Sequence, residues 1–428
     1  MYFNKKKTKN TKNSRNTKDN ESKNMKENHY MLKKQVLLLA LCITVSGTIS
    51  GCSRAGKSDR YSSAASREAV SSLAAQDEDS RENSDQTSSL AANDASPQDK
   101  RESVEIQDPD QIPMETIDIF AMDTYMTLTA YGEECSEALA DAAAEINRLD
   151  ALLSVGNEES EVYRINKTGG GQISRDTEIL LTESLDLYRR TGGAFDITIY
   201  PLMVEWGFTS GNYHVPDQSV INKLLQNVDS SKIAYDQDQK TIKLGEGQGI
   251  DFGAIAKGYA SSRVMDIYAQ HNLVSGLVSL GGNVQCYGTK VDGSLWKCGI
   301  TNPESPDDTG SLAGVIQAAD QAIITSGGYE RYFTDEKSGI TYHHIIDPAT
   351  GYSASSGLSS VTIISPDGML ADGLSTSLFI MGKDKAIDFW RTCRDEFDMI
   401  LITDDNQILI TEGIQDTFTS NYDYEIIR

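Results

Sequence analysis

Apolar residues recur at helical spacing in three segments of the chain. Residues 136–152 place apolar side chains at every third or fourth position, from Leu139 onward, which predicts an amphipathic helix. The same spacing predicts a second helix over residues 177–191, with two arginines in its last turn and Gly192 as its stop. A third helix is predicted from residue 257 to about residue 271.

Strand-like patterns surround these helices. Residues 117–131 alternate loosely between β-branched, aromatic and other residues, which is typical of a strand pair. Short apolar runs predict further strands at residues 276–280, 297–301, 314–318, 321–325, 360–364 and 399–402. Helices and strands are mixed without a regular βαβ alternation. The pattern therefore favours an α+β fold over a doubly wound parallel sheet.

The segment before residue 112 shows no helical or strand-like spacing of apolar residues. From Ser53 to Gln111 the chain consists mainly of Ser, Ala, Asp, Glu, Arg and Asn, with hardly an aromatic residue after Tyr61. Such a segment cannot bury enough apolar surface to offset the entropy that ordering costs. We therefore predict a flexible tether over residues 52–111 and one folded domain over residues 112–428.

An export signal is predicted ahead of the tether. Two lysines precede an apolar run, residues 36–45, that is too short to span a bilayer. The run leads to Ile49-Ser50-Gly51-Cys52, which resembles the lipobox of bacterial lipoproteins. The resemblance implies that residues 1–51 are a basic prefix with a signal peptide and that Cys52 is lipidated. Residues 1–30 are rich in Lys, Asn and Thr, and a start at Met31 would give a leader of normal proportions, so we predict that translation begins at Met31. The mature protein would then be lipid-anchored at the outer face of the cell membrane; an ordinary signal peptide with an incidental cysteine is the alternative.

The charge of the chain changes sign after this leader. Residues 1–51 carry eleven Lys and Arg against three Asp and Glu, whereas the whole chain of 428 residues carries 39 against 63, a net charge of −24. The remainder is therefore strongly acidic. Nucleic-acid binding needs clustered cations, so the composition argues against a nucleic-acid partner.

Four cysteines follow Cys52 in the sequence. No two of them are spaced as a Cys-x-x-Cys metal or redox pair. Export permits a disulfide, but a domain of this size does not require one. Buried thiols and a single bridge both remain open for Cys135, Cys286, Cys298 and Cys393.

Two short segments carry candidate chemistry. Asp372, Ser375 and Thr376 place one carboxylate and two hydroxyls three to four residues apart. At the start of a helix these groups would share one face and offer the oxygen ligands that Mg²⁺ prefers. Lys257, beside Gly258, can offer a cation to a phosphate. Taken singly, each has an ordinary structural explanation as a helix cap, a turn or a solvated charge.

The order of several motifs resembles that of the ApbE family of FAD:protein FMN transferases. The resemblance covers the whole folded region. It implies a single α+β domain of mixed, mainly antiparallel sheets with flanking helices. The most specific motifs are Gly-Gly-Ala-Phe-Asp196-Ile-Thr, Pro201-Leu202 with Trp206-Gly207-Phe208, Asp251 with Ala-Lys257-Gly-Tyr, and His344-Ile-Ile-Asp-Pro-Ala-Thr-Gly351.

The resemblance implies a phosphoryl transfer. FAD would be cleaved at its pyrophosphate, FMN would pass to a Thr or Ser hydroxyl of another protein, and AMP would leave. The implied partners are FAD as substrate and an exported or membrane flavoprotein that carries an Asp-Gly-x-Ser/Thr-x-x-Thr type motif. The expected acceptor is a subunit of a membrane redox complex. The implied cofactor is Mg²⁺.

The resemblance also assigns residues to roles. Mg²⁺ would be held by the carbonyl of Ala254 and by Asp372 and Thr376, with Ser375 alongside. Lys257 would stabilise phosphate charge, and His344 would handle a proton near the acceptor hydroxyl, unless it simply packs beside Asp347. Contacts to FAD would come from Met122, Ala194, Phe195, Asp196, Asp251, Lys257 and Ile346.

The chain departs from the family pattern at two positions. Ser375 stands where another member can carry Asp, which removes one charge from the metal site. Gly156 stands two residues after Ser154, where the family often has an aromatic residue that packs on the flavin. Less stacking would loosen FAD and admit water, unless Gly156 serves a turn with positive φ. The alternative functions are therefore a Mg²⁺-dependent FAD pyrophosphatase and a flavin-binding lipoprotein without turnover.

Overall fold

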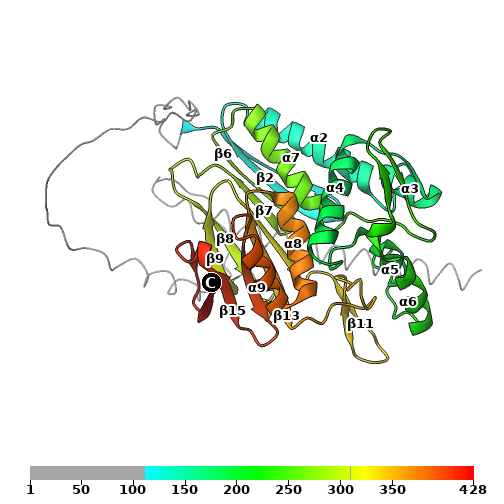
Figure 1. Cartoon of the computed structure of the whole chain (residues 1–428). Helices are drawn as coiled ribbons and strands as arrows, with labels where there is room; N and C mark the ends of the chain where they lie inside the picture. Colours follow the sequence, from blue (N-terminus) through cyan, green and yellow to red (C-terminus); the bar gives the residue numbers. More distant parts are fainter. Residues whose placement is uncertain (1–110, 309) are drawn as a thin grey trace, which may run out of the picture. The chain divides into compact units, whose positions relative to one another are not determined.

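A nine-stranded sheet organises the described part of the chain, which comprises residues 111–308 and 310–428 of a computed structural model (Figure 1). The predicted leader, Cys52 and almost all of the predicted tether lie outside the described residues. Within the described residues, no helix has the length and apolar character needed to cross a membrane.

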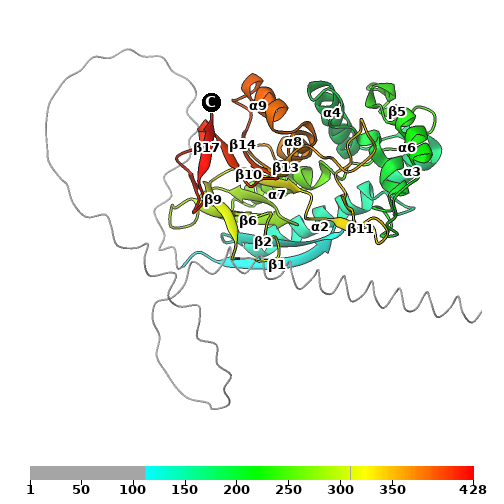
Figure 2. The ribbon, with the colours of Figure 1, turned by 90° about the horizontal axis from the view of Figure 1, so that it is seen from below.

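The strands of the large sheet are almost all antiparallel. Only β15 and β17 pair in parallel. Figure 2 shows β1 and β17 at opposite margins of the sheet, in agreement with the strand order. The α+β class with mainly antiparallel sheets is therefore confirmed. In spatial order the strands are β1 (Met114–Ala121), β2 (Thr124–Tyr131), β6 (Ser275–Leu280), β7 (Asn283–Tyr287), β10 (Ala322–Gly327), β13 (Leu358–Ser365), β14 (Asp398–Thr403), β15 (Ile408–Thr411) and β17 (Tyr424–Ile427).

Four helices pack in a row on one face of this sheet (Figure 1). They are α2 (Cys135–Leu153), α7 (Ala256–Gln270), α8 (Gly368–Met381) and α9 (Lys383–Thr392). Each packs on its neighbour in that order, and α8 lies over β10 and β13. The segment between β2 and β6 adds α3 (Glu161–Thr168), α4 (Arg175–Arg190), α5 (Tyr200–Glu205) and α6 (Gln218–Leu224).

The opposite face of the sheet is covered by a small sheet of β16 (Phe418–Thr419), β9 (Leu312–Ala318) and β8 (Trp296–Thr301). Successive residues of a strand point to opposite faces, and β10 shows the consequence. Ile324 belongs to the core under the helices, whereas Ile323 belongs to the core under the small sheet. The middle strands are thus buried on both faces, which explains their continuous apolar runs.

Two further small sheets complete the described domain. One consists of β3 (Gly170–Gln172), β5 (Thr241–Lys243) and β4 (Ala234–Asp236). The other is a ribbon of β11 (Tyr332–Thr334) and β12 (Thr341–His343).

A strained turn joins β1 to β2. Ala121 pairs with Thr124, so the hairpin loop has two residues, Met122 with φ 49° and Asp123 with φ 58°. Positive φ at both central residues defines the type I′ turn, whose twist suits a hairpin. A methionine rarely adopts this conformation, and such strain concentrates at functional sites. The predicted strand pair is therefore a tight hairpin with Met122 at its tip.

An aromatic cluster supports the β11–β12 ribbon. Trp206 and Phe208 are fully buried and contact Phe333 of β11. Gly207 between them has φ 80°, and a Cβ there would lie 2.2 Å from the carbonyl oxygen of Asn212. The Trp-Gly-Phe motif is thus a packing device: two aromatic anchors separated by a position that only glycine fits.

No disulfide joins the four cysteines that the structure describes. Cys135, Cys286 and Cys298 are buried, and Cys393 is half-buried. The sulfur atoms of Cys286 and Cys298 lie 3.9 Å apart, too far for a bond. The structure therefore agrees with buried thiols, the first of the two alternatives that the sequence left open.

Candidate active site

Asp372 lies at the contact between α7 and α8 and is only 3% exposed. The backbone N–H of Gly258 donates to its Oδ2 at 2.8 Å, and the side-chain amide of Asn283 donates to its Oδ1 at 3.0 Å. Both donors are neutral. Among the described residues, no Lys or Arg forms an ion pair with Asp372. The carboxylate is therefore fixed in orientation while its charge stays available to a cation.

Gly258 allows α7 to approach α8 at this point. A Cβ at residue 258 would lie 2.1 Å from the carbonyl oxygen of Gly368 and 2.6 Å from the Cβ of Asp372. Neither atom can move without shifting α8 itself. The glycine of the Lys-Gly pair is thus required by the close contact of the two helices.

A cluster of hydroxyl groups lies one turn further along α8. The Oγ of Ser326, at the end of β10, lies 2.8 Å from the Oγ of Ser375 and 3.2 Å from the Oγ1 of Thr376. Ser375 also donates to the carbonyl oxygen of Asp372 at 2.8 Å. The structure therefore brings the predicted triad of Asp372, Ser375 and Thr376 together and adds Ser326, which lies in a glycine-rich segment of the sequence but had been given no role.

The oxygen chemistry of this cluster fits a hard cation such as Mg²⁺. Within the described part of the chain, no three His, Cys, Asp or Glu side chains gather as a metal cluster. A cation here would therefore be held by one carboxylate together with hydroxyl and carbonyl oxygens. Ala254, whose carbonyl is the remaining predicted ligand, is half-buried in the turn that leads into α7.

Lys257 interacts electrostatically with three other site residues: Asp251, Glu330 and His344. They come from separate segments: Asp251 precedes α7, Glu330 follows β10, and His344 follows β12. By accessible surface, Asp251 and His344 are half-buried and Glu330 is exposed. The fold therefore assembles this group, which the sequence spreads over almost a hundred residues.

The tautomer of His344 follows from its hydrogen bond. Its Nδ1 lies 3.1 Å from the carbonyl oxygen of Arg331, which can only accept, so Nδ1 carries the proton. The Nε2 atom then presents a lone pair. Burial, followed by the positive charges of Arg331 and Lys257, lowers the pKa of His344 to about 3. The imidazole is therefore neutral at physiological pH, and its Nε2 is able to accept a hydrogen bond.

Glu330 is a site residue that the sequence did not indicate. Although the residue is exposed by accessible surface, nearby protein atoms desolvate its carboxyl and raise its pKa to about 7; the charge of Lys257 opposes this rise, and the charge of Asp372 adds to it. A carboxyl that titrates near neutral pH suits proton transfer at that pH. Glu330 follows the Gly327-Gly328 pair at the end of β10, and polar residues after a glycine pair at a strand end are the signal that could have indicated it.

Desolvation is also the main influence on the pKa of Asp251. Desolvation raises the pKa of this carboxyl, against the opposing effects of the Gly253 N–H, Arg331 and Lys257. The charge of Asp123 raises it further. Since Asp123 belongs to the strained hairpin, this interaction places the hairpin tip within electrostatic range of Asp251.

Three residues predicted to contact FAD have side chains engaged inside the protein. The carboxylate of Asp196 caps the short helix Ile197–Ile199 through Thr198 and accepts two further hydrogen bonds from Ser230. Phe195 and Ile346 are 2% and 4% exposed and belong to apolar cores. Any flavin contact at these residues would involve backbone or edge atoms. Met122 and Ala194 are half-buried and keep accessible surface.

Gly156 has an ordinary backbone conformation. Its φ is not positive, and a Cβ there would meet no atom within 4 Å. Its N–H donates to the Oγ of Ser154 at 3.3 Å. Backbone geometry therefore does not require a glycine at this position, and the alternative explanation of a positive-φ turn is wrong.

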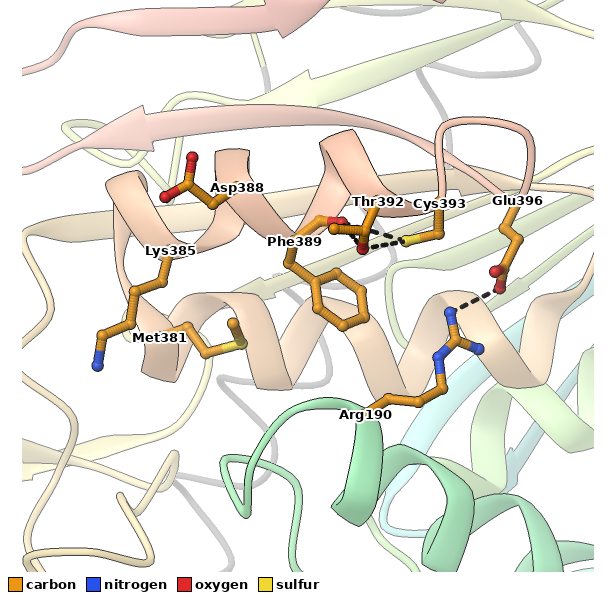
Figure 3. A pocket seen from close by; sticks show the side chains of 8 residues that line it. All are labelled: Arg190, Met381, Lys385, Asp388, Phe389, Thr392, Cys393 and Glu396. Carbon is orange, nitrogen blue, oxygen red and sulfur yellow. Dashed lines mark hydrogen bonds and ion pairs between the residues drawn. The ribbon is translucent and has the colours of Figure 1, made fainter.

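A surface groove of about 500 Å³ lies elsewhere, between α4, the end of α8 and α9. Figure 3 shows Phe389 at its centre and Arg190 paired with Glu396 at one side. It contains none of the predicted site residues. The chemistry therefore concentrates at the α7–α8 contact and not in this groove.

Comparison with known proteins identifies the family. Residues 122–401 match the ApbE family model. A protein of Klebsiella pneumoniae (strain 342) named FAD:protein FMN transferase is 34% identical over 280 residues, covering 64% of this chain and 85% of the relative. The chain belongs to the ApbE family. A second relative with the same name, from Treponema pallidum (strain Nichols), is 29% identical and covers 66% of this chain and 82% of its own length.

Solved structures of ApbE proteins share the fold. The crystal structure of the ApbE protein of Thermotoga maritima has a TM-score of 0.67 and 30% identity, and the match covers 71% of this chain and 99% of that one. The apo flavinyl transferase ApbE of Pseudomonas stutzeri gives a TM-score of 0.64 at 25% identity, with 73% and 98% coverage. The ApbE-like single domain is thus confirmed, and the family match runs from the hairpin tip at Met122 past the whole of α8.

Proposed function

We propose that this protein is a FAD:protein FMN transferase that depends on Mg²⁺. Family membership supports a flavin transferase, and the observation that carries the metal dependence is the arrangement of Asp372. Its carboxylate is oriented by the N–H of Gly258 and the amide of Asn283, and no cation neutralises it among the described residues.

The groups around Asp372 suit the cleavage of a pyrophosphate. Mg²⁺ held by Asp372, Thr376 and the carbonyl of Ala254, with Ser375 and Ser326 alongside, would neutralise charge on the two phosphates. Lys257 supplies a second positive charge from the adjacent first turn of α7. Together these groups stabilise the charge that develops when the bond between the phosphates breaks.

The transfer step needs one acceptor hydroxyl, and it forms one phosphoester bond for the one pyrophosphate bond that it breaks. The oxygen of a Thr or Ser on the partner protein attacks the phosphorus of the FMN half, a phosphoester bond forms, and the bond to the phosphate of AMP breaks. The hydroxyl proton passes to a base of the enzyme. His344 was predicted for this role, but a pKa of about 3 makes it a weak base, and Glu330, with a pKa of about 7, is better matched to neutral pH.

The proposal extends to where the protein acts. We propose export and lipid anchoring through Cys52, on the resemblance of residues 49–52 to a lipobox. The acceptor would then be an exported or membrane flavoprotein that carries the Asp-Gly-x-Ser/Thr-x-x-Thr type motif. Such a partner meets a tethered enzyme at the same membrane surface.

One incubation tests the activity. The protein is mixed with FAD and Mg²⁺, with and without an acceptor protein that carries the motif, and the products are separated by mass. AMP together with a fluorescent acceptor heavier by FMN supports transfer. Retained FAD, with no AMP in either mixture, would leave a flavin-binding lipoprotein without turnover and refute the proposal.

One observation favours a second activity. Gly156 offers no ring to stack on the flavin and has open space around it, so FAD is held less tightly and water can reach the phosphorus. Hydrolysis would give free FMN and AMP without an acceptor. In the same incubation, equal AMP release with and without the acceptor would identify a FAD pyrophosphatase.

A further inference from the structure

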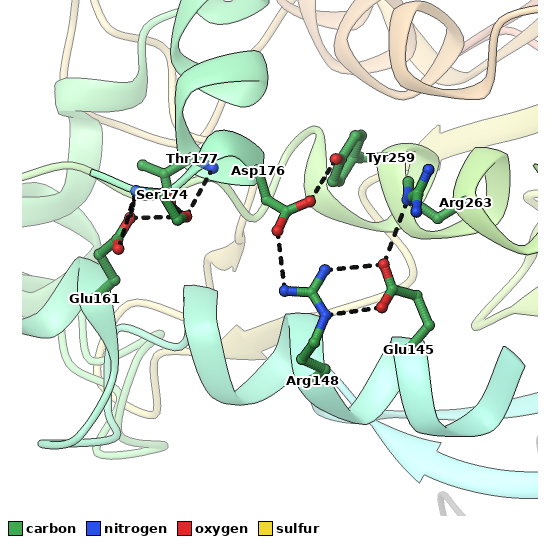
Figure 4. Close-up of polar contacts among 8 residues, drawn as sticks. All are labelled: Glu145, Arg148, Glu161, Ser174, Asp176, Thr177, Tyr259 and Arg263. Carbon is green, nitrogen blue, oxygen red and sulfur yellow. Dashed lines mark hydrogen bonds and ion pairs between the residues drawn. The ribbon is translucent and has the colours of Figure 1, made fainter. Parts of the chain in front are cut away.

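Tyr259 directly follows the residue whose peptide N–H holds Asp372. The N–H of Gly258 donates to Asp372, and the hydroxyl of Tyr259 donates to Oδ1 of Asp176 at 2.7 Å (Figure 4). Tyr259 is buried in the main apolar core. One turn of α7 therefore forms hydrogen bonds both to the carboxylate of the proposed metal site and to Asp176 of α4.

Asp176 is itself held by a chain of ion pairs. Its second oxygen accepts from Nη1 of Arg148 at 2.9 Å. Arg148 makes two further bonds to Glu145, at 2.7 and 2.9 Å, and Glu145 also accepts from Arg263 of α7 at 3.3 Å. Figure 4 shows that these side chains, from α2, α4 and α7, are linked to one another by an unbroken series of hydrogen bonds. We call Glu145, Arg148, Asp176, Tyr259 and Arg263 the Tyr259 network.

The carboxylate at the centre of this network is charged. The side chain of Asp176 is 17% exposed, and burial alone acts to raise its pKa. The hydrogen bonds from Arg148 and Tyr259 outweigh burial, so the pKa of Asp176 lies below its usual value. A hydrogen bond to an ionised acceptor is about twice as strong as a neutral one, so the anchor of Tyr259 is a firm one.

The first turn of α7 is uncapped in the sense that its N-cap residue, Ile255, offers no side-chain acceptor. Two of its N–H groups are held by other partners: that of Ala256 donates to the carbonyl oxygen of Phe252 at 2.9 Å, and that of Gly258 donates to Asp372. The turn contains no acidic residue that would favour the helix dipole. This is the turn that carries Lys257 and Gly258, so its position determines that of both groups.

We propose that Tyr259 and Asp176 are positioning residues for the metal site: their hydrogen bond fixes the uncapped first turn of α7, and through the N–H of Gly258 it fixes the carboxylate of Asp372. The inference rests on the proposed Mg²⁺ dependence. Neither residue is among the predicted metal ligands or FAD contacts. The consequence is that removing one hydroxyl, at Tyr259, weakens Mg²⁺ binding without removing any ligand.

The chain offers a matched control on the same helix. Tyr268 of α7 is also buried, and its hydroxyl donates to the carbonyl oxygen of Thr129 at 3.2 Å, away from the uncapped turn. Tyr259→Phe and Tyr268→Phe each remove one hydroxyl and one hydrogen bond. Tyr259→Phe loses a bond to a charged acceptor and should cost more thermal stability than Tyr268→Phe. Mg²⁺ binding is therefore compared well below the melting temperature of both variants, where a difference in affinity reports positioning.

The experiment is a calorimetric titration of Mg²⁺ into the full chain, solubilised in detergent and free of FAD. Outer contacts of a metal site typically change affinity by 10- to 100-fold, and for this more distant contact we expect Tyr259→Phe to weaken binding by about threefold to tenfold. Tyr268→Phe should bind as the wild type does. Asp176→Asn keeps an acceptor oxygen for Tyr259 and should fall between the wild type and Tyr259→Phe.

Failure of the positioning inference can be distinguished from failure of the proposed function. Equal Mg²⁺ affinity of Tyr259→Phe and Tyr268→Phe, or a wild-type protein that binds no Mg²⁺, overturns the inference. A wild-type protein that binds Mg²⁺ but transfers no FMN overturns the proposed function alone, because the titration does not depend on turnover. In an active protein, Tyr259→Phe should raise the Mg²⁺ concentration at half-maximal rate while leaving the rate at saturating Mg²⁺ within about twofold of the wild type.

Discussion

The hydrogen-bond donors to Asp372 are neutral groups, which leaves its carboxylate charged for a metal ion. A buried carboxylate normally pairs with Lys or Arg, and that pairing neutralises it. Here a peptide N–H donates to one carboxylate oxygen and a side-chain amide donates to the other. Both donors are neutral, so the carboxylate keeps its negative charge, and each oxygen has a further lone pair. At the scale of single residues, the site is therefore defined by which partners Asp372 lacks among the described residues as much as by those it has.

Replacing Asp372 tests this assignment. Asp372→Asn removes the charge and turns an NH₂ toward one of the two donors, so we expect Mg²⁺-dependent FAD cleavage to fall by about 100-fold or more. The initial rate at limiting Mg²⁺ measures it. Asp367→Asn, which keeps an oxygen to cap Met369 and Leu370 at the start of α8, is the control. Unchanged activity of Asp372→Asn would refute the metal assignment.

The pH dependence of turnover should reveal Glu330. Its raised pKa means that it holds a proton below about pH 7 and is ionised above it. If it takes the proton of the acceptor hydroxyl, kcat/KM for FAD should rise through pH 7 and then level off. Glu330→Gln should lower the plateau and abolish that rise, whereas His344→Asn should leave the rise in place. A rise that persists in Glu330→Gln would assign the base elsewhere.

Gly156 is a position where a side chain can be added. Since the site is open and the backbone conformation ordinary, Gly156→Tyr can place a ring against the flavin. Stacking is worth about 0.5–1.5 kcal/mol, so FAD should bind roughly twofold to tenfold more tightly, and FMN release to water should slow. Fluorescence titration of FAD measures the affinity, with Gly156→Ala as the control that adds no ring. Weaker binding in the tyrosine variant would contradict the stacking account.

At the scale of elements, the contact between α7 and α8 decides the geometry of the site. Lys257 and Gly258 belong to one helix, and Asp372, Ser375 and Thr376 belong to the other. Helices approach this closely only where small residues face each other, and Gly258 opposite Gly368 provides that surface. A small change at this contact should therefore affect both stability and metal binding.

Gly258→Ala tests the contact. The added methyl group meets backbone atoms that cannot yield, and overpacking of this kind costs about 1–3 kcal/mol of the free energy of unfolding. Urea unfolding measures the loss, and the same variant should need more Mg²⁺ for half-maximal turnover. Gly156→Ala, placed in open space, should show neither effect. A Gly258→Ala protein with wild-type stability would mean that α7 and α8 are further apart than the structure places them.

At the scale of the whole molecule, the leader and tether would deliver the domain to its partner. Cys52 lies outside the described residues, so its role stays a prediction from the lipobox-like segment. Cys52→Ser should move the protein from the membrane fraction to the soluble fraction without changing turnover by the folded domain. Fractionation after a carbonate wash, with immunodetection, measures this. Retention of the variant on the membrane would show that something other than the lipid holds it.

Periodicity alone determined the elements whose patterns are local. The predicted helix over residues 136–152 is α2, that over 177–191 is α4, and the third is α7, each within two residues. The helix α8 was not placed by periodicity, because it is buried on nearly every side, its buried polar residues included, and so lacks the solvent-exposed polar face that gives a period. The short strands β11 and β12 were likewise missed, since three residues carry too little pattern.

Motif order in the sequence determined the family and singled out Asp372, Ser375, Thr376 and Lys257, because those residue types carry the chemistry wherever the fold places them. Only the tertiary structure decided which groups share the site. Ser326, Asn283 and Glu330 lie at strand ends far from α8 in the chain, and no local pattern links them to it. The state of each group was also decided by the fold, since burial and neighbouring charges set the pKa of His344 and Glu330. Sequence names the reactive groups; their distances and surroundings exist only once the chain has folded.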